Sequence, residues 1–450
     1  MHKSVDLTEL DLSIVHALQL APRAPWNTLG EVLGVDHTTV ARHWARLEEQ
    51  GSAWLMAYYP AWHDGLCRAR VEVDCAGGAV DAVAQALVHD PHVVSVDLTH
   101  NGGDLQLTVS AGDMGVLSRY VTDRLHRLPG VERIAVHPVT REYADGRQWR
   151  LDALNAEQVR QLTAISPAPH GGTVPPGPEE LRILSVLGPD GRCSWTQLAE
   201  RTEASAATVR RKVHRMMREG TLAFRCEVAA HSAGWPVQVL YTAQCPANRL
   251  ECAALELAVL PGVRSVAALA GPANLAVTAW LRSAADIQQL EVLMLRRGQE
   301  LVITRRSVTL QALKRMGRLL GADGRRIGYV PMDVWSEPVG DGSVKRALAR
   351  GVAGGLGGFW RVRLQAREAG SSAAAHDRPR DARRTERRIS PRPLRPGSAS
   401  DHLLARAMNV AKVLWSAIMT GSSPCLRRVT QAIRASGVCS GAHLRASGVA

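Results

Sequence analysis

Residues 33–51 read LGVDHTTVARHWARLEEQG, and this stretch decides the fold. Gly34 permits a tight turn, because glycine adopts positive φ angles without steric cost. The Asp36 carboxylate can cap the helix that follows, and Gly51 is the residue type that most often follows the end of a helix. The stretch therefore predicts a short polar helix that begins directly after a tight turn.

The two faces of this helix differ in polarity. At about 100° per residue, Val40, Trp44 and Leu47 fall on one arc, which predicts a side that faces the core. The opposite side and its flanks hold polar residues: Thr38, Thr39, Arg42, His43 and Arg46. Arginines on the exposed side of such a helix suit the major groove of DNA, where a guanidinium group reads guanine or clamps a phosphate. The alternative is an ordinary solvated face.

An internal repeat extends this pattern. Residues 12–55, shifted by 169 positions, align with residues 181–224 without a gap, and 12 of the 44 positions are identical. Chance at this composition gives about three or four identities. The identities include the following pairs: Arg23/Arg192, Trp26/Trp195, Arg42/Arg211 and Arg46/Arg215. A whole unit is therefore duplicated.

Each copy of the unit predicts three helices and a wing strand. In the first copy the helices fall at about 8–20, 26–33 and 37–50, and the strand at 54–59. In the second copy Ser205 is the expected cap of the third helix, Gly220 ends it, and the strand falls at 222–228. Its outward polar residues are Thr208, Arg210, Arg211, Lys212 and Arg215.

A second type of domain follows each helical unit. Strands at 67–74, 92–99, 105–110 and 131–137 alternate with helices at 78–88 and 113–128, and residues 237–308 repeat this order. The order β-α-β-β-α-β is the ferredoxin-like pattern. Its open sheet favours pairing with a second copy, so we expect a pseudo-dimer within one chain.

The charge of the chain lies mostly in its last part. Residues 338–450 hold 20 Lys/Arg and 6 Asp/Glu, a net charge of +14, whereas the remainder has a net charge of −1. The sequence there is rich in Arg, Pro, Ala and Ser, which predicts disorder. Non-specific phosphate binding and an unselected translation of a shifted frame remain alternative interpretations of this tail.

On these motifs, each half resembles the Lrp/AsnC (feast/famine) family of transcriptional regulators, over residues 6–141 and 178–312. The resemblance implies control of transcription, double-stranded DNA as a partner, homo-oligomers, and a small-molecule effector such as an amino acid. The family's turn between the second and third effector strands reads Gly-x-x-Asp. The residues at this turn, and the implied effector-binding residues, are Asn101, Gly102, Asp104, Gly271 and Asn274. Each copy departs from the pattern once, with Asn101 for Gly and Asn274 for Asp.

The expected fold class is α+β, with two winged helix-turn-helix domains, each followed by a ferredoxin-like effector domain. The expected boundaries are as follows: 1–62 for the first winged helix-turn-helix domain, 63–141 for the first effector domain, 142–177 for a linker, 178–232 for the second winged helix-turn-helix domain, 233–335 for the second effector domain with a trailing segment, and 336–450 for the tail. Residues 154–163 suit a short helix with Asn155 near its start.

An enzyme is the main alternative function. Siroheme decarboxylases resemble the same two-module architecture and carry a His-x-Tyr-Asn-Leu-Trp stretch, whereas residues 271–276 here read GPANLA and lack the His and Tyr. We find no phosphate-binding loop, metal-binding motif or nucleophile motif, so we expect no catalytic residues, no metal and no cofactor. The chain also lacks an apolar run of membrane-spanning length and a secretory signal, which predicts no membrane partner and a cytoplasmic location. A third alternative is a ligand-binding scaffold that does not contact DNA.

Overall fold

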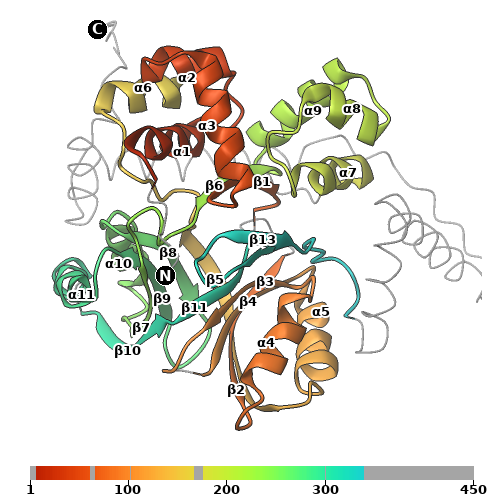
Figure 1. Cartoon of the computed structure of the whole chain (residues 1–450). Coiled ribbons are helices and arrows are strands. Elements are labelled where there is room, and N and C mark those ends of the chain that lie inside the picture. Colours follow the sequence, from red (N-terminus) through yellow and green to blue (C-terminus); the bar gives the residue numbers. More distant parts are fainter. Residues whose placement is uncertain (1–6, 61–65, 102, 167–175, 299, 339–450) are drawn as a thin grey trace, which may run out of the picture. The chain divides into compact units, whose positions relative to one another are not determined.

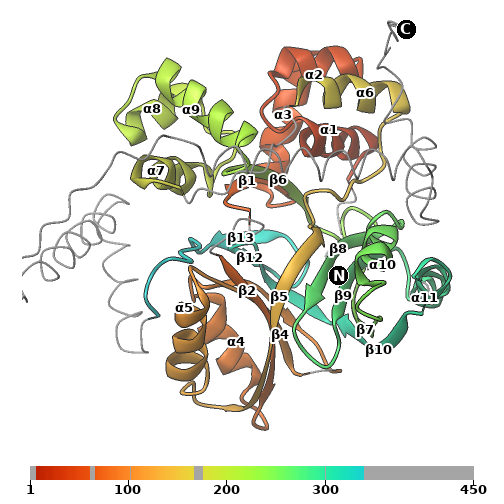
Figure 2. The same cartoon turned by 180° about the vertical axis from the view of Figure 1, so that it is seen from behind.

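The computed structural model describes residues 7–60, 66–101, 103–166, 176–298 and 300–338. All of these residues belong to one compact unit, Met1–Leu348, which Figures 1 and 2 show from opposite sides. The tail at 339–450, residues 167–175 of the predicted linker, and Gly102 lie outside the described residues.

The first winged helix-turn-helix domain consists of α1 (Glu9–Leu20), α2 (Trp26–Leu33), α3 (His37–Glu49) and β1 (Ala53–Tyr58). Thr8 caps α1, and the Asp36 carboxylate caps α3 by accepting the backbone N–H of Thr38, as predicted. Gly34 has a φ of 69°, in the left-handed region that favours glycine. The tight turn between α2 and α3 therefore has the residue that its backbone requires.

The second winged helix-turn-helix domain repeats the first, with α7 (Pro178–Leu187), α8 (Trp195–Thr202), α9 (Ala206–Arg218) and β6 (Ala223–Val228). Both bounds of α8 and of α9 lie 169 positions after those of α2 and α3. Ser205 caps α9 as predicted. Glu203 occupies the position of Gly34 and keeps the left-handed backbone with a φ of 55°. A residue with a side chain pays about 1–2 kcal/mol for that conformation.

The two wing strands pair with each other. β1 and β6 form an antiparallel ribbon in which Ala53 lies opposite Val228 and Tyr58 lies opposite Ala223. One hydrophobic core contains buried side chains from both helical domains, including Leu47 of α3 and Met216 of α9. The two helix-turn-helix domains therefore share a core and a sheet.

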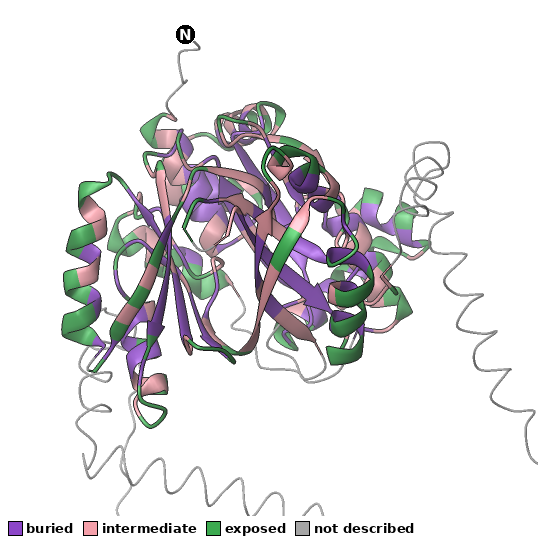
Figure 3. Cartoon of the chain, turned by 90° about the horizontal axis from the view of Figure 1, so that it is seen from below, coloured by how far each residue is buried: buried purple, intermediate pink, exposed green. Residues whose placement is uncertain are grey.

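Each effector domain has the predicted β-α-β-β-α-β order. The first consists of β2 (Cys67–Cys75), α4 (Val80–Val88), β3 (Val93–Leu98), β4 (Leu105–Ala111), α5 (Met114–Arg119) continued by η1 (Tyr120–Leu125), and β5 (Val131–Ala144). The second consists of β7 (Val237–Gln244), α10 (Leu250–Ala258), β8 (Val263–Leu269), β9 (Leu275–Leu281), α11 (Ala285–Arg297) and β10 (Val302–Thr309). Buried and exposed residues alternate around the helices, and the central strands β4 and β9 are buried almost throughout, whereas β5 and β10 are mostly intermediate or exposed (Figure 3).

The two effector sheets join at two edges, as expected for a pseudo-dimer within one chain. Within the described residues the strand order is β10-β7-β9-β8-β5-β2-β4-β3-β11-β12-β13. β5 pairs with β2 as far as Pro138 and with β8 from Val139 onward. At the opposite edge, β3 pairs with β11 (Gln311–Arg315), which follows β10 directly.

The stretch predicted as a linker contains α6 (Ala156–Ile165), which Asn155 caps near the expected position. Leu162 is fully buried in the core of the helical domains, and the Gln158 side chain donates to the Val32 carbonyl at 3.1 Å. Part of the linker is therefore a structural part of the first helix-turn-helix domain. β5 also continues to Ala144, three residues past the expected boundary at 141.

The trailing segment differs from the expectation that it belongs with the second effector domain. Its strands are β11, β12 (Arg318–Leu320) and β13 (Arg326–Tyr329), and β11 pairs with the first effector domain. The buried Arg318 guanidinium donates to the carbonyls of Gly188 and Pro189, each at 2.8 Å. The backbone N–H of Arg326 donates to the carbonyl of Gly51 at 2.9 Å. The segment thus contacts both helical domains as well.

No helix in the described part of the chain is both long enough and apolar enough to cross a membrane.

Candidate nucleic-acid interface

The first half of α3 presents the predicted polar residues to solvent. Val40, Trp44 and Leu47 are buried, as their spacing predicts. Thr38 and Arg42 are exposed and Thr39 is half-buried. The Arg42 guanidinium has no acidic partner among the residues that the structure describes. Arg42 is therefore free to bind a group outside the protein.

The second half of α3 turns toward α1 instead. Nη2 of Arg46 and Nδ1 of His43 lie 2.6 Å and 2.8 Å from Oδ1 of Asp11. Burial alone raises the pKa of Asp11, but hydrogen bonds from His43, Thr8 and Arg46 outweigh it and hold the pKa below its ordinary value. Arg46 and His43 are thus partnered within the protein.

The second copy has the same ion pair. Nη2 of Arg215 lies 2.9 Å from Oε1 of Glu180, and Glu180 and Arg215 lie 169 positions after Asp11 and Arg46. Lys212 pairs with Glu179 of α7. The spacing of residues along the third helix does not indicate these partners, because the acids lie on the first helix. The sequence feature that indicates the ion pair is an acidic residue 35 positions before the arginine in both copies.

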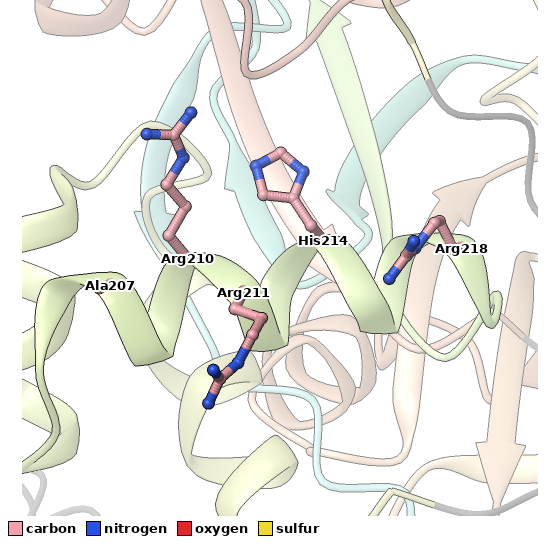
Figure 4. A pocket seen from close by; sticks show the side chains of 5 residues that line it. All are labelled: Ala207, Arg210, Arg211, His214 and Arg218. Atoms are coloured by element: carbon pink, nitrogen blue, oxygen red, sulfur yellow. The ribbon is translucent and has the colours of Figure 1, made fainter.

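The outer face of α9 holds three further arginines. Arg210, Arg211 and Arg218 are exposed and have no acidic partner within the described part of the chain, and Thr208 beside them is half-buried. With Ala207 and His214, the three arginines line a shallow surface concavity (Figure 4). Burial, Arg210 and other nearby arginines lower the pKa of His214, which favours a neutral ring. The concavity is therefore positively charged through its guanidinium groups.

A reciprocal contact joins the two helix-turn-helix domains. The Arg23 guanidinium lies 4.1 Å from the centre of the Trp195 ring, and the Arg192 guanidinium lies 3.6 Å from that of Trp26. Nη1 of Arg23 donates to the carbonyls of Gly191 and Cys193, each at 2.9 Å. The Arg192 guanidinium donates to two carbonyls of the first domain in the same way: Pro22 and Ala24, each at 2.9 Å. We call these contacts the Arg–Trp clamp.

The clamp relates α3 and α9 by an approximate two-fold arrangement. Its four residues are two of the identical pairs of the sequence repeat. Their role could not be predicted from the repeat, because each arginine contacts the tryptophan of the other copy. Together with the β1–β6 ribbon, the clamp attaches each helical domain to the other through side chains and backbone. The two exposed helix faces are therefore presented as one pair.

The predicted effector-site residues lie at turns where the two copies meet. Oδ2 of Asp104 accepts the backbone N–H of Cys75 at 2.8 Å, and Oδ1 of Asn274 accepts that of Cys245 at 3.0 Å. Nδ2 of Asn101 donates to the carbonyl of Arg306 at 2.9 Å. These side chains therefore hold the turns in place.

Gly271 lies against β5 of the other copy. A Cβ atom there would lie 2.8 Å from Nδ1 of His137, so only glycine fits without a shift. Gly102 lies outside the described residues. No group of described side chains has the composition of a metal site.

Charged side chains lie between the effector domains. Nη2 of Arg70 reaches Oγ of Ser265 at 3.4 Å, and Arg305 pairs with Glu72. Nε of Arg70 and Oδ1 of Asp97 are buried and have no hydrogen-bond partner within the described part of the chain, although Oδ1 of Asp97 lies 3.8 Å from Nη2 of Arg315 in an ion pair. Burial raises the pKa of Asp97, against the charges of Arg315 and Arg70. We call these five residues, Arg70, Glu72, Asp97, Ser265 and Arg305, the inter-domain polar layer.

Family models match three parts of the chain. The Lrp/AsnC ligand binding domain matches residues 68–149, and the AsnC-type helix-turn-helix domain matches residues 7–48. A winged helix-turn-helix DNA-binding domain matches residues 180–222. An uncharacterized HTH-type transcriptional regulator of Pyrococcus abyssi is 28% identical over 110 residues, which are 24% of this chain and 68% of that protein.

Solved structures with a similar chain path include two kinds of protein. The siroheme decarboxylase NirDL, in a co-complex with an iron-uroporphyrin III analogue, is 16% identical with a TM-score of 0.47 and covers 69% of this chain and 93% of its own. The leucine response regulatory protein LrpA of Mycobacterium tuberculosis is 18% identical with a TM-score of 0.29 and covers 30% of this chain and 93% of its own.

Proposed function

Because the chain belongs to the Lrp/AsnC family of DNA-binding transcriptional regulators, we propose that α3 and α9 contact DNA bases and phosphates. We further propose that a small molecule, an amino acid or a related compound, changes DNA affinity from the effector domains. The observation that carries the first proposal is the exposure of Arg42 and Arg211, which occupy equivalent positions of the repeat and lack acidic partners among the described residues.

The ion pairs divide the cations of each helix into two groups. The proposed DNA-facing residues lie toward the first half of each helix: Thr38, Thr39, Arg42, Thr208, Arg210 and Arg211. Arg218, exposed at the end of α9, is a further candidate for a phosphate contact. The others support the helix from its own domain, since their charges already have acidic partners: His43, Arg46, Lys212 and Arg215. An arginine that already pairs with a carboxylate gains less from a phosphate than a free one does.

The test is DNA binding by the full chain, with a labelled duplex from the region upstream of its own gene. Loss of an arginine that reads a base costs about 1–3 kcal/mol, or about 5- to 150-fold in Kd. We therefore expect Arg42→Ala and Arg211→Ala to weaken binding. The control is Arg127→Ala, because Arg127 is exposed on the first effector domain and pairs with Asp123 one helical turn away.

If both variants bound DNA with unchanged affinity, the proposal that α3 and α9 contact DNA would be wrong. The absorption spectrum of the purified protein addresses the alternative function. A tetrapyrrole band together with absent DNA binding would support a decarboxylase-like enzyme instead of a regulator.

The inter-domain polar layer supports the second proposal. A zwitterionic ligand such as an amino acid needs a cation for its carboxylate and an acceptor for its ammonium group. Arg70 Nε and Asp97 Oδ1 are buried without hydrogen-bond partners among the described residues, and the ammonium group would share Asp97 with Arg315, whose Nη2 lies 3.8 Å from Oδ1. Asn101, Asp104, Gly271 and Asn274 hold the turns beside this layer. They are therefore proposed to shape the effector site rather than to contact the ligand through their side chains.

Thermal unfolding with each common amino acid tests effector binding. A ligand at about 100 times its Kd stabilises the folded state by about 2.7 kcal/mol, which raises Tm by several degrees. We expect Asp97→Asn to abolish the shift and Asp81→Asn, an exposed change on α4, to preserve it. If no amino acid changes Tm or DNA affinity, the sensing proposal fails.

We also propose that chains associate, as the family resemblance implies. Light scattering of the purified protein measures this directly, and a mass of one chain at micromolar concentration would contradict it.

A further inference from the structure

The two helices proposed to contact DNA carry very different charges. α3 (HTTVARHWARLEE) contains two arginines and two glutamates, so its net charge is zero with neutral histidines. α9 (AATVRRKVHRMMR) contains five Lys/Arg and no acidic residue. The difference is large for two helices whose bounds, caps and buried positions match.

Most of the difference lies on the outward face. Positions 210, 211 and 218 of α9 are exposed arginines, and the equivalent positions of α3 hold Ala41, Arg42 and Glu49. Glu49 and Arg218 are both exposed, and the side-chain charge at this position is therefore negative in the first copy and positive in the second. These positions contribute three of the five charge units that separate the helices. The other two come from Lys212, which pairs with Glu179 and replaces His43, and from Met217, which replaces Glu48. Arg46 and Arg215 are equivalent and do not contribute, because each has an acid on the first helix of its own domain.

We propose that the chain recognises a DNA site with two unequal halves, in which α9 supplies most of the affinity and α3 supplies a weaker contact. This inference rests on the proposed function. Three guanidinium groups on one helix repel one another in the free protein, and a run of phosphates relieves that repulsion. α3 offers a single free arginine and places Glu49 where a phosphate would be repelled.

The salt dependence of binding measures how many phosphates each helix neutralises. Each phosphate contact to duplex DNA adds about 0.9 to the slope of log K against log salt concentration. Replacing Arg210, Arg211 and Arg218 together by alanine should therefore lower the slope by about 2–3. Arg42→Ala should lower it by about 1 at most. The probe is a random-sequence duplex of about three helical turns, long enough for two half-sites.

Selection from a duplex library with a randomised centre tests the shape of the site. We expect the full chain to enrich a site with one strongly specified half and one weakly specified half. Arg211→Ala should erase the strong half and raise Kd at least about tenfold more than Arg42→Ala does. The double variant Ala41→Arg/Glu49→Arg copies the α9 pattern onto α3, and it should raise affinity and the salt slope.

The outcomes separate this inference from the proposed function. Binding to no duplex at all, with every variant folded by circular dichroism, would overturn the proposed function. A palindromic site with equal losses in Arg42→Ala and Arg211→Ala would overturn only the unequal halves. Unchanged affinity in Ala41→Arg/Glu49→Arg would also count against the inference, because the added charges face the same polyanion.

Discussion

The Arg–Trp clamp should carry a measurable part of the stability of the helical domains. In Arg192→Lys, the charge remains but the planar fork that reaches both Pro22 and Ala24 is lost, because an ammonium group cannot span two carbonyls and stack on Trp26 together. Burial and the like charge of Arg23 lower the pKa of Arg192 only to about 10, so its guanidinium is charged at neutral pH.

The expected loss follows from the contacts. A hydrogen bond from a charged group contributes about 1.5–3 kcal/mol, and a cation–π contact contributes about 0.5–2 kcal/mol. Lysine should keep one of the two hydrogen bonds and part of the stacking. Arg192→Lys should therefore lower the free energy of unfolding by about 2–4 kcal/mol.

Urea unfolding followed by circular dichroism measures this loss. The matched control is Arg182→Lys on α7, because Arg182 is exposed and its side chain makes no hydrogen bond or close ion pair within the described part of the chain. The control should change the free energy of unfolding by less than about 0.5 kcal/mol. Equal small effects in both variants would refute the view that the clamp holds the two domains together.

Three ionisable groups give further predictions, each tested by urea unfolding across pH. Burial and the charge of Asp190 raise the pKa of Glu48 to about 7, so the folded state binds the proton more tightly than the unfolded state, and stability falls as pH rises from 4.5 to 7. Glu48→Gln should therefore be more stable than the wild type by about 1–3 kcal/mol at pH 8 and lose this advantage near pH 5. Burial lowers the pKa of Lys314 to about 7, so wild-type stability should rise by about 1.4 kcal/mol per pH unit above pH 7, and Lys314→Met should remove that slope. Asp11 has a lowered pKa, so Asp11→Asn should cost about 1–2 kcal/mol at pH 7, with a smaller difference near pH 3; an equal cost at both pH values would contradict the ion pair with Arg46.

The local structure of both helical domains follows from the sequence. The bounds of α2, the caps at Asp36 and Ser205, and the buried positions of α3 and α9 agree with the helical spacing. They could be predicted because capping and burial depend on residues within a few positions of one another. The order of strands and helices in each effector domain is also as predicted.

Contacts between distant segments could not be predicted in the same way. The projection placed Arg46 and Arg215 on an outward face, but their partners lie on another helix. The pairing of β1 with β6 joins segments 170 positions apart, and neither strand carries a local pattern that selects its partner. The contacts of the trailing segment with the first effector domain were missed for the same reason.

The β1–β6 ribbon also affects how DNA binding should depend on the concentration of the protein. In a regulator built from two identical subunits, the pair of recognition helices exists only when subunits associate, so it is lost on dilution. Here both helices and both ribbon strands belong to one covalent chain, and the pair persists at any concentration. Where one chain occupies an operator, occupancy should then rise with a Hill coefficient of one, and a higher coefficient would report the association of further chains on the DNA.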